Sequence, residues 1–71
     1  MTDIKTYLLS KNHPDKGYIR WMMSVEKMVL KSLQLYITDL PDEDYMNYYS
    51  ILYTPRQVAD IVIKNNLIFP F

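Results

Sequence analysis

The sequence predicts an all-α fold, a small bundle of three to four helices around a central helix at about residues 18–36. Apolar residues recur at helical spacing along most of the chain, while the alternation that marks strands is weak. Prolines and capping residues fall where such helices would begin or end. The chain is 49% hydrophobic with one glycine, which argues against disorder, and its 71 residues suit a single helical domain, 1–71.

A short first helix is expected after an N-cap at Thr2 or Asp3. Ile4, Tyr7 and Leu8 stand at i, i+3 and i+4 spacing and would share its inner face. The helix must end before Pro14, because the residue preceding a proline is driven out of the α region. A helix of about nine residues is not stable alone, so it must pack on another element.

The central helix carries one narrow polar face and a wide apolar zone. The polar face consists of Arg20, Ser24, Lys27, Lys31 and Gln34. The opposite face holds Met22, Val25, Val29, Leu33 and Tyr36, and Trp21, Met23, Met28 and Leu30 widen it. A helix that is apolar over most of its circumference needs several neighbours, or a second copy of the protein, to cover it.

A third helix is expected at about residues 41–51. Pro41 suits the first turn of a helix, where no backbone N–H is needed. Asp42, Glu43 and Asp44 follow it, where the positive end of the helix dipole favours carboxylates.

The fourth helix has the clearest local signal in the chain. In the stretch TPRQVA, Thr54 is a good N-cap, Pro55 fits the first helical position, and Gln57 can complete a capping box. Asn65 or Asn66 is the expected left-handed stop.

Residues 11–17, KNHPDKG, contain a His-Pro-Asp-Lys sequence. It resembles the loop with which J-domain co-chaperones stimulate the ATPase of Hsp70. J-domains carry that loop after two helices, whereas only twelve residues precede His13. The following helix is also apolar rather than strongly charged. We therefore interpret the stretch as a turn between the first two helices, with Lys16 and Gly17 inside the turn.

The net charge is zero but unevenly distributed. Residues 1–37 hold six Lys/Arg and three Asp/Glu, whereas residues 38–71 hold two and five. The fold could cancel these charges internally or present a basic and an acidic pole. Overall neutrality argues against avid, non-specific binding to nucleic acid.

The residue types for catalysis and metal binding are sparse. The chain has no cysteine, one histidine (His13), and no glycine-rich phosphate loop. The carboxylates around residues 39–44 lack the spacing and central glycine of a calcium loop. We expect no enzyme, no cofactor and no metal site. No apolar run is long enough to span a bilayer and no secretory signal is visible, so we expect a cytoplasmic protein without a membrane partner.

Residues 45–53, YMNYYSILY, hold four of the seven tyrosines. On a helix Tyr45, Tyr48, Tyr49 and Leu52 share one side. These rings could pack into the core or form a contact surface, because tyrosine is enriched at interfaces. The candidate partner-binding residues are Tyr45, Tyr48, Tyr49, Asp42, Glu43, Asp44, Phe69 and Phe71.

The succession DLPDEDY, a tyrosine-rich helix, TPRQVA and a final I-x-x-N covers about residues 37–65. It resembles small uncharacterised helical proteins of bacteriophages and their hosts. The resemblance implies phage or mobile-element origin, a cytoplasmic location and no assigned activity. We expect a small non-enzymatic binding protein that acts by protein–protein contact, a phage-encoded regulator or inhibitor of a host protein.

The alternative is a DNA-binding or transcription-modulating protein, because Thr-Pro-x-x-x-Ala opens many helix-turn-helix units. That motif needs a recognition helix after the turn, and only five residues follow Asn66. Nucleic acid is therefore not the expected partner. A homodimer is expected instead, since Trp21, Met28 and Tyr48 with the tail LIFPF would form a large apolar patch. If that tail folds back over the patch, the chain stays a monomer.

Overall fold

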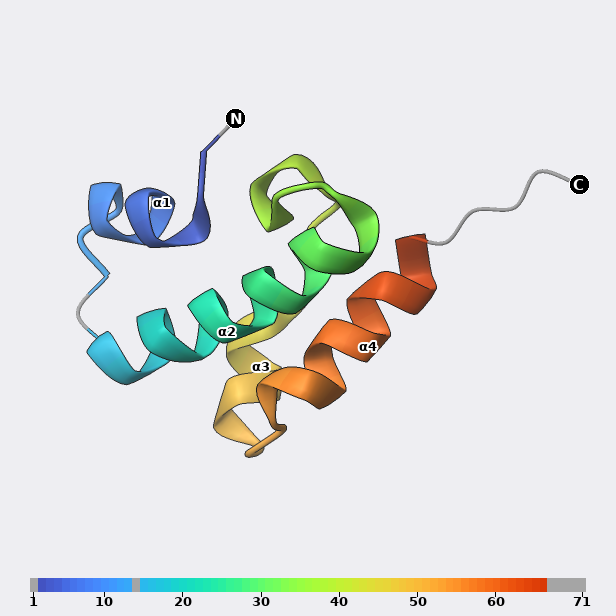
Figure 1. The fold of residues 1–71 in the computed structure, drawn as a ribbon. Coiled ribbons are helices and arrows are strands. Elements are labelled where there is room, and N and C mark those ends of the chain that lie inside the picture. The colour runs from blue at the N-terminus through green and yellow to red at the C-terminus, as the bar shows by residue number, and fades with distance from the viewer. Residues whose placement is uncertain (1, 14, 67–71) are drawn as a thin grey trace, which may run out of the picture.

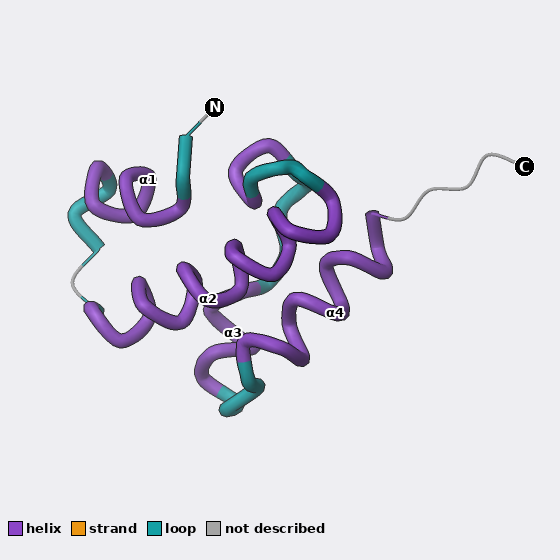
Figure 2. Tube along the Cα trace, in the orientation of Figure 1, coloured by secondary structure: helices purple, strands orange, loops and turns teal. Residues whose placement is uncertain are grey.

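Four α-helices and one 3-10 turn make up the part of the chain that the computed structural model describes, residues 2–13 and 15–66. They are α1 (Ile4–Ser10), α2 (Lys16–Leu33), η1 (Ile37–Asp39), α3 (Tyr45–Ser50) and α4 (Pro55–Asn66), with no strand among these residues. α2 lies between α1 and α4 and contacts both, and α3 packs beside it (Figure 1). Loops join the helices, and the connection from α2 to α3 contains η1 (Figure 2). The predicted all-α bundle around a central helix is confirmed.

The core lies mainly between α2 and α4, the most extensive pairing of elements in the bundle. Its fully buried large side chains are Met22, Val25, Val29, Val58 and Val62. Complete burial of one such side chain stabilises the fold by about 1.5–3 kcal/mol. The predicted polar face of the central helix is exposed at all five positions, so its helical register is confirmed.

The boundaries of α2 differ from the predicted 18–36. The helix begins at Lys16 because Asp15 is its N-cap, with Asp15 Oδ1 accepting a hydrogen bond from the Tyr18 N–H at 3.0 Å. Lys16 and Gly17 therefore lie in the first helical turn, and their assignment to a preceding loop was wrong. At the other end Gln34 adopts a left-handed conformation, with φ of 57°, and stops the helix.

α1 is capped as expected. Asp3 Oδ1 accepts a hydrogen bond from the Thr6 N–H at 2.8 Å, and hydrogen bonding to Thr6 lowers the pKa of Asp3. Ile4 and Leu8 are buried against α2. This short helix is thus held by tertiary packing and one cap, as its length requires.

A buried carboxylate joins α1 to α2. Glu26 is only 7% exposed, and both of its carboxylate oxygens lie 3.0 Å from the Ile4 N–H, which donates to them. Burial raises the pKa of Glu26, while the backbone N–H groups of Ile4 and Ile37 act in the opposite direction. Glu26 therefore ties the N-terminus of α1, and the neighbouring η1, to the central helix.

The third predicted helix, 41–51, was wrong at its N-terminal end. Leu40 is extended, with φ of −104° and ψ of 161°, as the residue before a proline must be, and residues 41–44 form an irregular loop. α3 begins only at Tyr45, and the Asp44 side chain makes no capping hydrogen bond. Asp42, Glu43 and Asp44 therefore belong to the loop and do not occupy a first helical turn.

α4 begins as predicted. The Thr54 N–H donates to Gln57 Oε1 at 2.8 Å, and the Gln57 N–H donates to Thr54 Oγ1 at 3.2 Å, which completes the capping box. The predicted left-handed stop was wrong, because Asn65 and Asn66 are both helical. The Asn66 side-chain amide donates to the Val62 carbonyl at 2.9 Å, which supports the last turn.

Candidate functional site

The tyrosines of α3 contact aromatic side chains of α2. Tyr49 meets the rings of Tyr18 and Trp21 edge to face, with centroids 5.2 and 5.4 Å apart. The Trp21 indole N–H donates to the Tyr53 carbonyl at 2.9 Å, and Tyr48 stacks on Tyr53 at 5.4 Å. These half-buried rings pack against the core and attach α3, with the turn that follows it, to α2.

The single glycine of the chain makes room for one of these rings. A Cβ atom at Gly17 would lie 2.9 Å from the Tyr49 hydroxyl, closer than a carbon and an oxygen can approach. Burial raises the pKa of Tyr49, and the nearby Asp15 carboxylate raises it further. The first turn of α2 is therefore shaped to receive Tyr49.

Large apolar side chains project from α3 and the turn after it. Leu52 is 87% exposed, and Met46 and Ile51 are also exposed. We call these three residues the α3 tip. Leu52 has a φ of 68°, in the left-handed region that a leucine rarely adopts. The prediction that Leu52 shares a side with Tyr45, Tyr48 and Tyr49 was wrong, because the helix ends at Ser50.

The acidic residues of the predicted site do not form one cluster with the tyrosines. Asp42 and Asp44 are exposed, and Glu43 is half-buried, with its carboxylate 3.3 Å from the side-chain amide of Asn65. Asp42 and Tyr45 both line one cavity. Phe69 and Phe71 lie outside the described residues.

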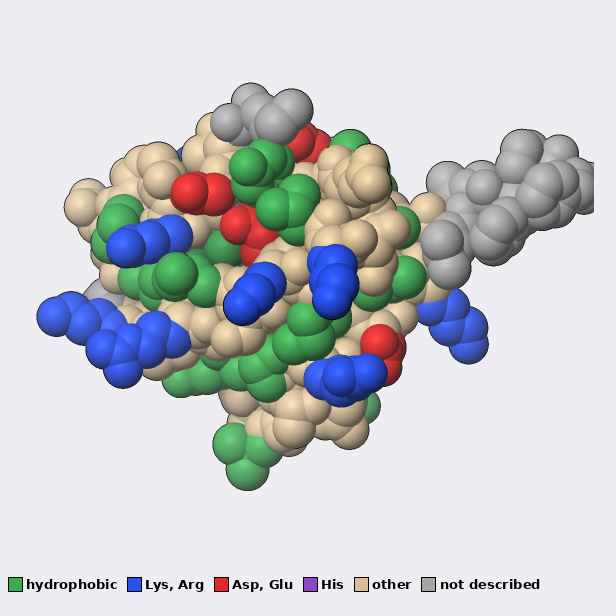
Figure 3. Space-filling view, in the orientation of Figure 1, with side chains coloured by type: hydrophobic (Ala, Val, Ile, Leu, Met, Phe, Trp, Pro, Cys, Tyr) green, Lys and Arg blue, Asp and Glu red, His purple; other side chains and the backbone are tan. Residues whose placement is uncertain are grey.

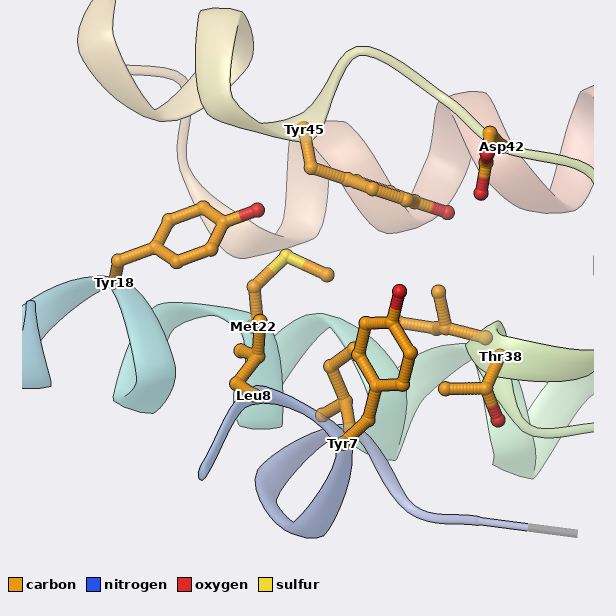
Figure 4. Close-up of a pocket in the computed structure, with 9 residues that line it drawn as sticks. Tyr7, Leu8, Tyr18, Met22, Thr38, Asp42 and Tyr45 are labelled. Carbon is orange, nitrogen blue, oxygen red and sulfur yellow. The ribbon is translucent and has the colours of Figure 1, made fainter. Parts of the chain in front are cut away.

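That cavity, which we call the chamber, has a volume of about 140 Å³ and lies between α1, α2, η1 and α3. Tyr45 and Asp42 occupy one wall, and Tyr7 faces them across the cavity (Figure 4). The Tyr45 hydroxyl is buried and has no hydrogen-bond partner among the described residues. A buried polar group without a partner costs about 1–3 kcal/mol.

The electrostatic environment of Tyr45 is negative. Burial raises the pKa of Tyr45 well above its ordinary value of 10, and the charges of Glu43 and Asp42 raise it further. The phenol therefore stays protonated and can donate a hydrogen bond.

Basic side chains gather on another face, around α1 and α2 (Figure 3). Lys5, Lys16 and Arg20 line a groove there with Met23, and Lys27 lines the adjoining grooves. Asp3 and Glu26 line one of these adjoining grooves together with Lys27, so acidic side chains border the basic ones there. We call this surface the basic groove.

The one histidine has a local structural role. His13 Nδ1 accepts a hydrogen bond from the Asp15 N–H at 3.3 Å, and the imidazole stacks on Tyr18 with ring centroids 4.8 Å apart. Within residues 2–13 and 15–66, no three His, Asp or Glu side chains come together as a metal site would require. None of the helices in this part of the chain is long and apolar enough to cross a membrane.

Sequence reasoning did not identify the chamber. Its lining comes from α1, α2, η1, the acidic loop and the start of α3, so no linear motif marks it. Thr38 stood in no pattern. Tyr7 was predicted on the apolar face of the first helix, but it is 41% exposed and lines the chamber. Glu26 was also missed, although it lies four residues after Met22 and three before Val29, on the buried face of the helix.

Comparisons of the chain with family models, with curated proteins and with solved structures found no match.

Proposed function

We propose that this chain is a small non-enzymatic binding protein that acts by protein–protein contact through the α3 tip. The observation that carries the proposal is Leu52, a leucine exposed to 87% on a left-handed backbone with φ of 68°. The backbone conformation of Leu52 is explained by the end of α3. The Leu52 N–H donates to the Tyr49 carbonyl at 3.1 Å and the Tyr53 N–H donates to the Tyr48 carbonyl at 3.0 Å, so Leu52 ends this helix as Gln34 ends α2. The exposed side chain has no such local explanation, and neighbouring exposed apolar side chains are typical of contact surfaces.

The packing of α3 against the central helix favours the same function. Trp21 and Tyr49 attach α3 to the central helix, so the exposed side chains of the tip have a defined place on the fold. A pre-positioned apolar side chain loses little entropy when a partner covers it. Leu52 and Ile51 can therefore serve as anchors in a partner's pocket.

The resemblance to phage-type helical proteins supplies the proposed setting. In that setting the chain acts in the cytoplasm as a phage-encoded regulator or inhibitor of a host protein. A second copy of the chain is the first partner to test. Trp21, Met28 and Tyr48, which belong to the apolar patch expected for a dimer, are half-buried against the core, so the α3 tip is the better candidate for self-contact.

The experiment compares partners captured by three tagged proteins in bacterial cells. Leu52→Asn removes the apolar side chain, yet asparagine tolerates the left-handed backbone, so the fold is kept. Lys27→Glu changes an exposed residue of the basic groove and is the matched control. A partner that the wild type and Lys27→Glu retain and Leu52→Asn loses supports the proposal. Identical partners for all three proteins would exclude the α3 tip as the contact.

Self-association is measured separately, by sedimentation equilibrium at about 10 µM, where a homodimer of moderate affinity is populated. A dimer that Leu52→Asn dissociates identifies the second copy as a partner. A single 8.5 kDa species for the wild type would exclude a second copy as the partner at this concentration.

DNA binding is the second candidate, and the basic groove is the observation that favours it. Lys5, Lys16 and Arg20 lie together there, and Lys27 extends the positive surface. Fluorescence anisotropy with a labelled duplex, titrated with salt, tests it, because binding through phosphates weakens steeply as salt rises. DNA binding would be favoured over protein contact if binding depends on salt and is weakened by Lys27→Glu. Leu52→Asn should then leave the binding unchanged.

A further inference from the structure

The chamber has the dimensions of a small-molecule site. Its volume is about 140 Å³, and engineered apolar cavities of about 150 Å³ take up benzene. Its apolar lining is formed by Ile4, Leu8, Met22 and Ile37. One six-membered ring, or an alkyl group of similar volume, fits such a space.

One wall of the chamber is polar. The Tyr45 hydroxyl points along this wall on the side of Asp42 and Thr38, and the Tyr7 hydroxyl points toward the same region from α1 (Figure 4). The Tyr45 hydroxyl is buried and makes no hydrogen bond to any described residue. The chamber therefore combines an apolar floor with an unused hydrogen-bonding group and a carboxylate.

The carboxylates of the acidic loop, residues 41–44, determine the sign of the charge that a ligand in the chamber can carry. Burial is the main cause of the raised pKa of Tyr45, and the Glu43 and Asp42 carboxylates raise it further because their negative potential disfavours a negative charge on the Tyr45 oxygen. The same potential stabilises a cation and repels an anion. The tyrosine rings in the lining can also attract a cation through their faces.

We propose that the chamber binds a small organic cation, an ammonium group joined to an apolar body about the size of one phenyl ring. The apolar body lies between Leu8, Met22 and Ile37. The ammonium group donates hydrogen bonds to the Asp42 carboxylate and to the Tyr45 hydroxyl oxygen, which acts as an acceptor. This binding site is separate from the α3 tip and does not depend on the proposed protein contact.

Water is the competing occupant. A polar cavity of this size holds ordered waters, and one of them could satisfy the Tyr45 hydroxyl without any ligand. If water is the occupant, the charge of an added compound should make no difference to the chamber. A test of charge selectivity therefore separates the two occupants.

The test uses three probes that share a phenyl ring and differ in charge: phenethylammonium, 2-phenylethanol and 3-phenylpropanoate. Each is titrated into the ¹⁵N-labelled full chain and followed by amide NMR shifts. We expect phenethylammonium to cause saturable shifts at Leu8, Met22 and Ile37 with a Kd of about 1 mM, a plausible affinity for so small a ligand. 2-Phenylethanol should bind about tenfold more weakly, and 3-phenylpropanoate should leave these amides unchanged.

Two variants and one control locate the charge and the hydroxyl. Asp42→Asn should weaken phenethylammonium binding about tenfold, because a charge-assisted hydrogen bond is lost. Asp44→Asn removes an exposed carboxylate of the same loop that does not line the chamber, and it should leave the Kd within about twofold. Tyr45→Phe keeps the ring and removes only the unpartnered hydroxyl, so this variant should fold and bind several-fold more weakly.

Two results would overturn the proposal. Equal binding of all three probes would show that the chamber does not select a cation. Absence of saturable shifts with phenethylammonium at concentrations up to about 50 mM, well above the expected Kd, would leave water as the occupant.

Discussion

α3 and α4 follow one another in the sequence but are stabilised in different ways. α4 has 12 residues, a complete capping box and three buried side chains, Val58, Ala59 and Val62. α3 has six residues, no side-chain capping bond and no buried residue. It is attached by half-buried rings and by one indole hydrogen bond to the turn after it. Burial of aliphatic side chains thus determines where α4 lies, whereas aromatic edges and one donor position α3.

The helices that stabilise the fold are therefore not the segment that exposes large apolar side chains. A segment with little buried apolar area opens at a lower free energy than the core does, and segments that bind partners are drawn from this group. The turn after α3 exposes Leu52 and Ile51, while α4 turns its own branched side chains inward. The core of the fold therefore lies between α2 and α4, and the α3 tip is the surface that we propose for partner contact.

The largest expected effect comes from a charge in the α2–α4 core. Val62→Asp places a carboxylate where the side chain is fully buried, at a cost of several kcal/mol. A chain of this size has a total stability on the order of 5 kcal/mol, so the variant should be unfolded at 25 °C. Ile51→Asp, at an exposed position of the α3 tip, should melt within a few degrees of the wild type. Circular dichroism melts in the reverse order would contradict the comparison.

The next effect concerns the attachment of α3. Trp21→Phe keeps an aromatic ring but removes the indole N–H that the Tyr53 carbonyl accepts. We expect a loss of about 1–3 kcal/mol in the free energy of unfolding, because a part-buried acceptor is left without its partner. Hydrogen exchange should accelerate first at the amides of residues 45–53. Equal acceleration across α4 would show that the two helices open together.

A smaller loss is expected at the start of α4. Thr54→Ala removes the hydroxyl that accepts the Gln57 N–H and should lower the free energy of unfolding by about 1 kcal/mol. Thr54→Ser keeps the hydroxyl and serves as the control. An unchanged urea midpoint for Thr54→Ala would mean that the capping box adds nothing to stability.

The effect of Glu26 should be visible as a pH dependence. Its folded-state pKa is raised above the ordinary value of 4.5, so the folded protein binds more protons than the unfolded chain above that pH. The contribution of Glu26 to stability is therefore greatest at low pH. It falls as the pH rises from the ordinary pKa of the unfolded chain to the raised pKa of the folded protein. Glu26→Gln keeps an oxygen for the Ile4 N–H and should remove the fall. A stability difference between wild type and Glu26→Gln that is constant from pH 4 to 7 would refute the raised pKa.

The sequence predicted those features whose signals are local or strictly periodic. The exposed stripe of α2 and the capping box of Thr54 and Gln57 are of this kind, and both are confirmed. The start of the third helix was misplaced because Pro41 is equally compatible with an irregular loop, and η1 precedes it. The chamber depends on tertiary packing of five segments, which no window of the sequence contains.

The smallest expected change in stability tests the central claim most directly, namely that the fold does not need the Leu52 side chain. Leu52→Gly removes a side chain that is 87% exposed and relieves a φ of 68° that glycine adopts freely. Urea denaturation should show the free energy of unfolding unchanged or raised, by up to about 1 kcal/mol. A loss of 1 kcal/mol or more, on the order of that for a displaced core side chain, would show that Leu52 supports the fold and would contradict its assignment to the contact surface.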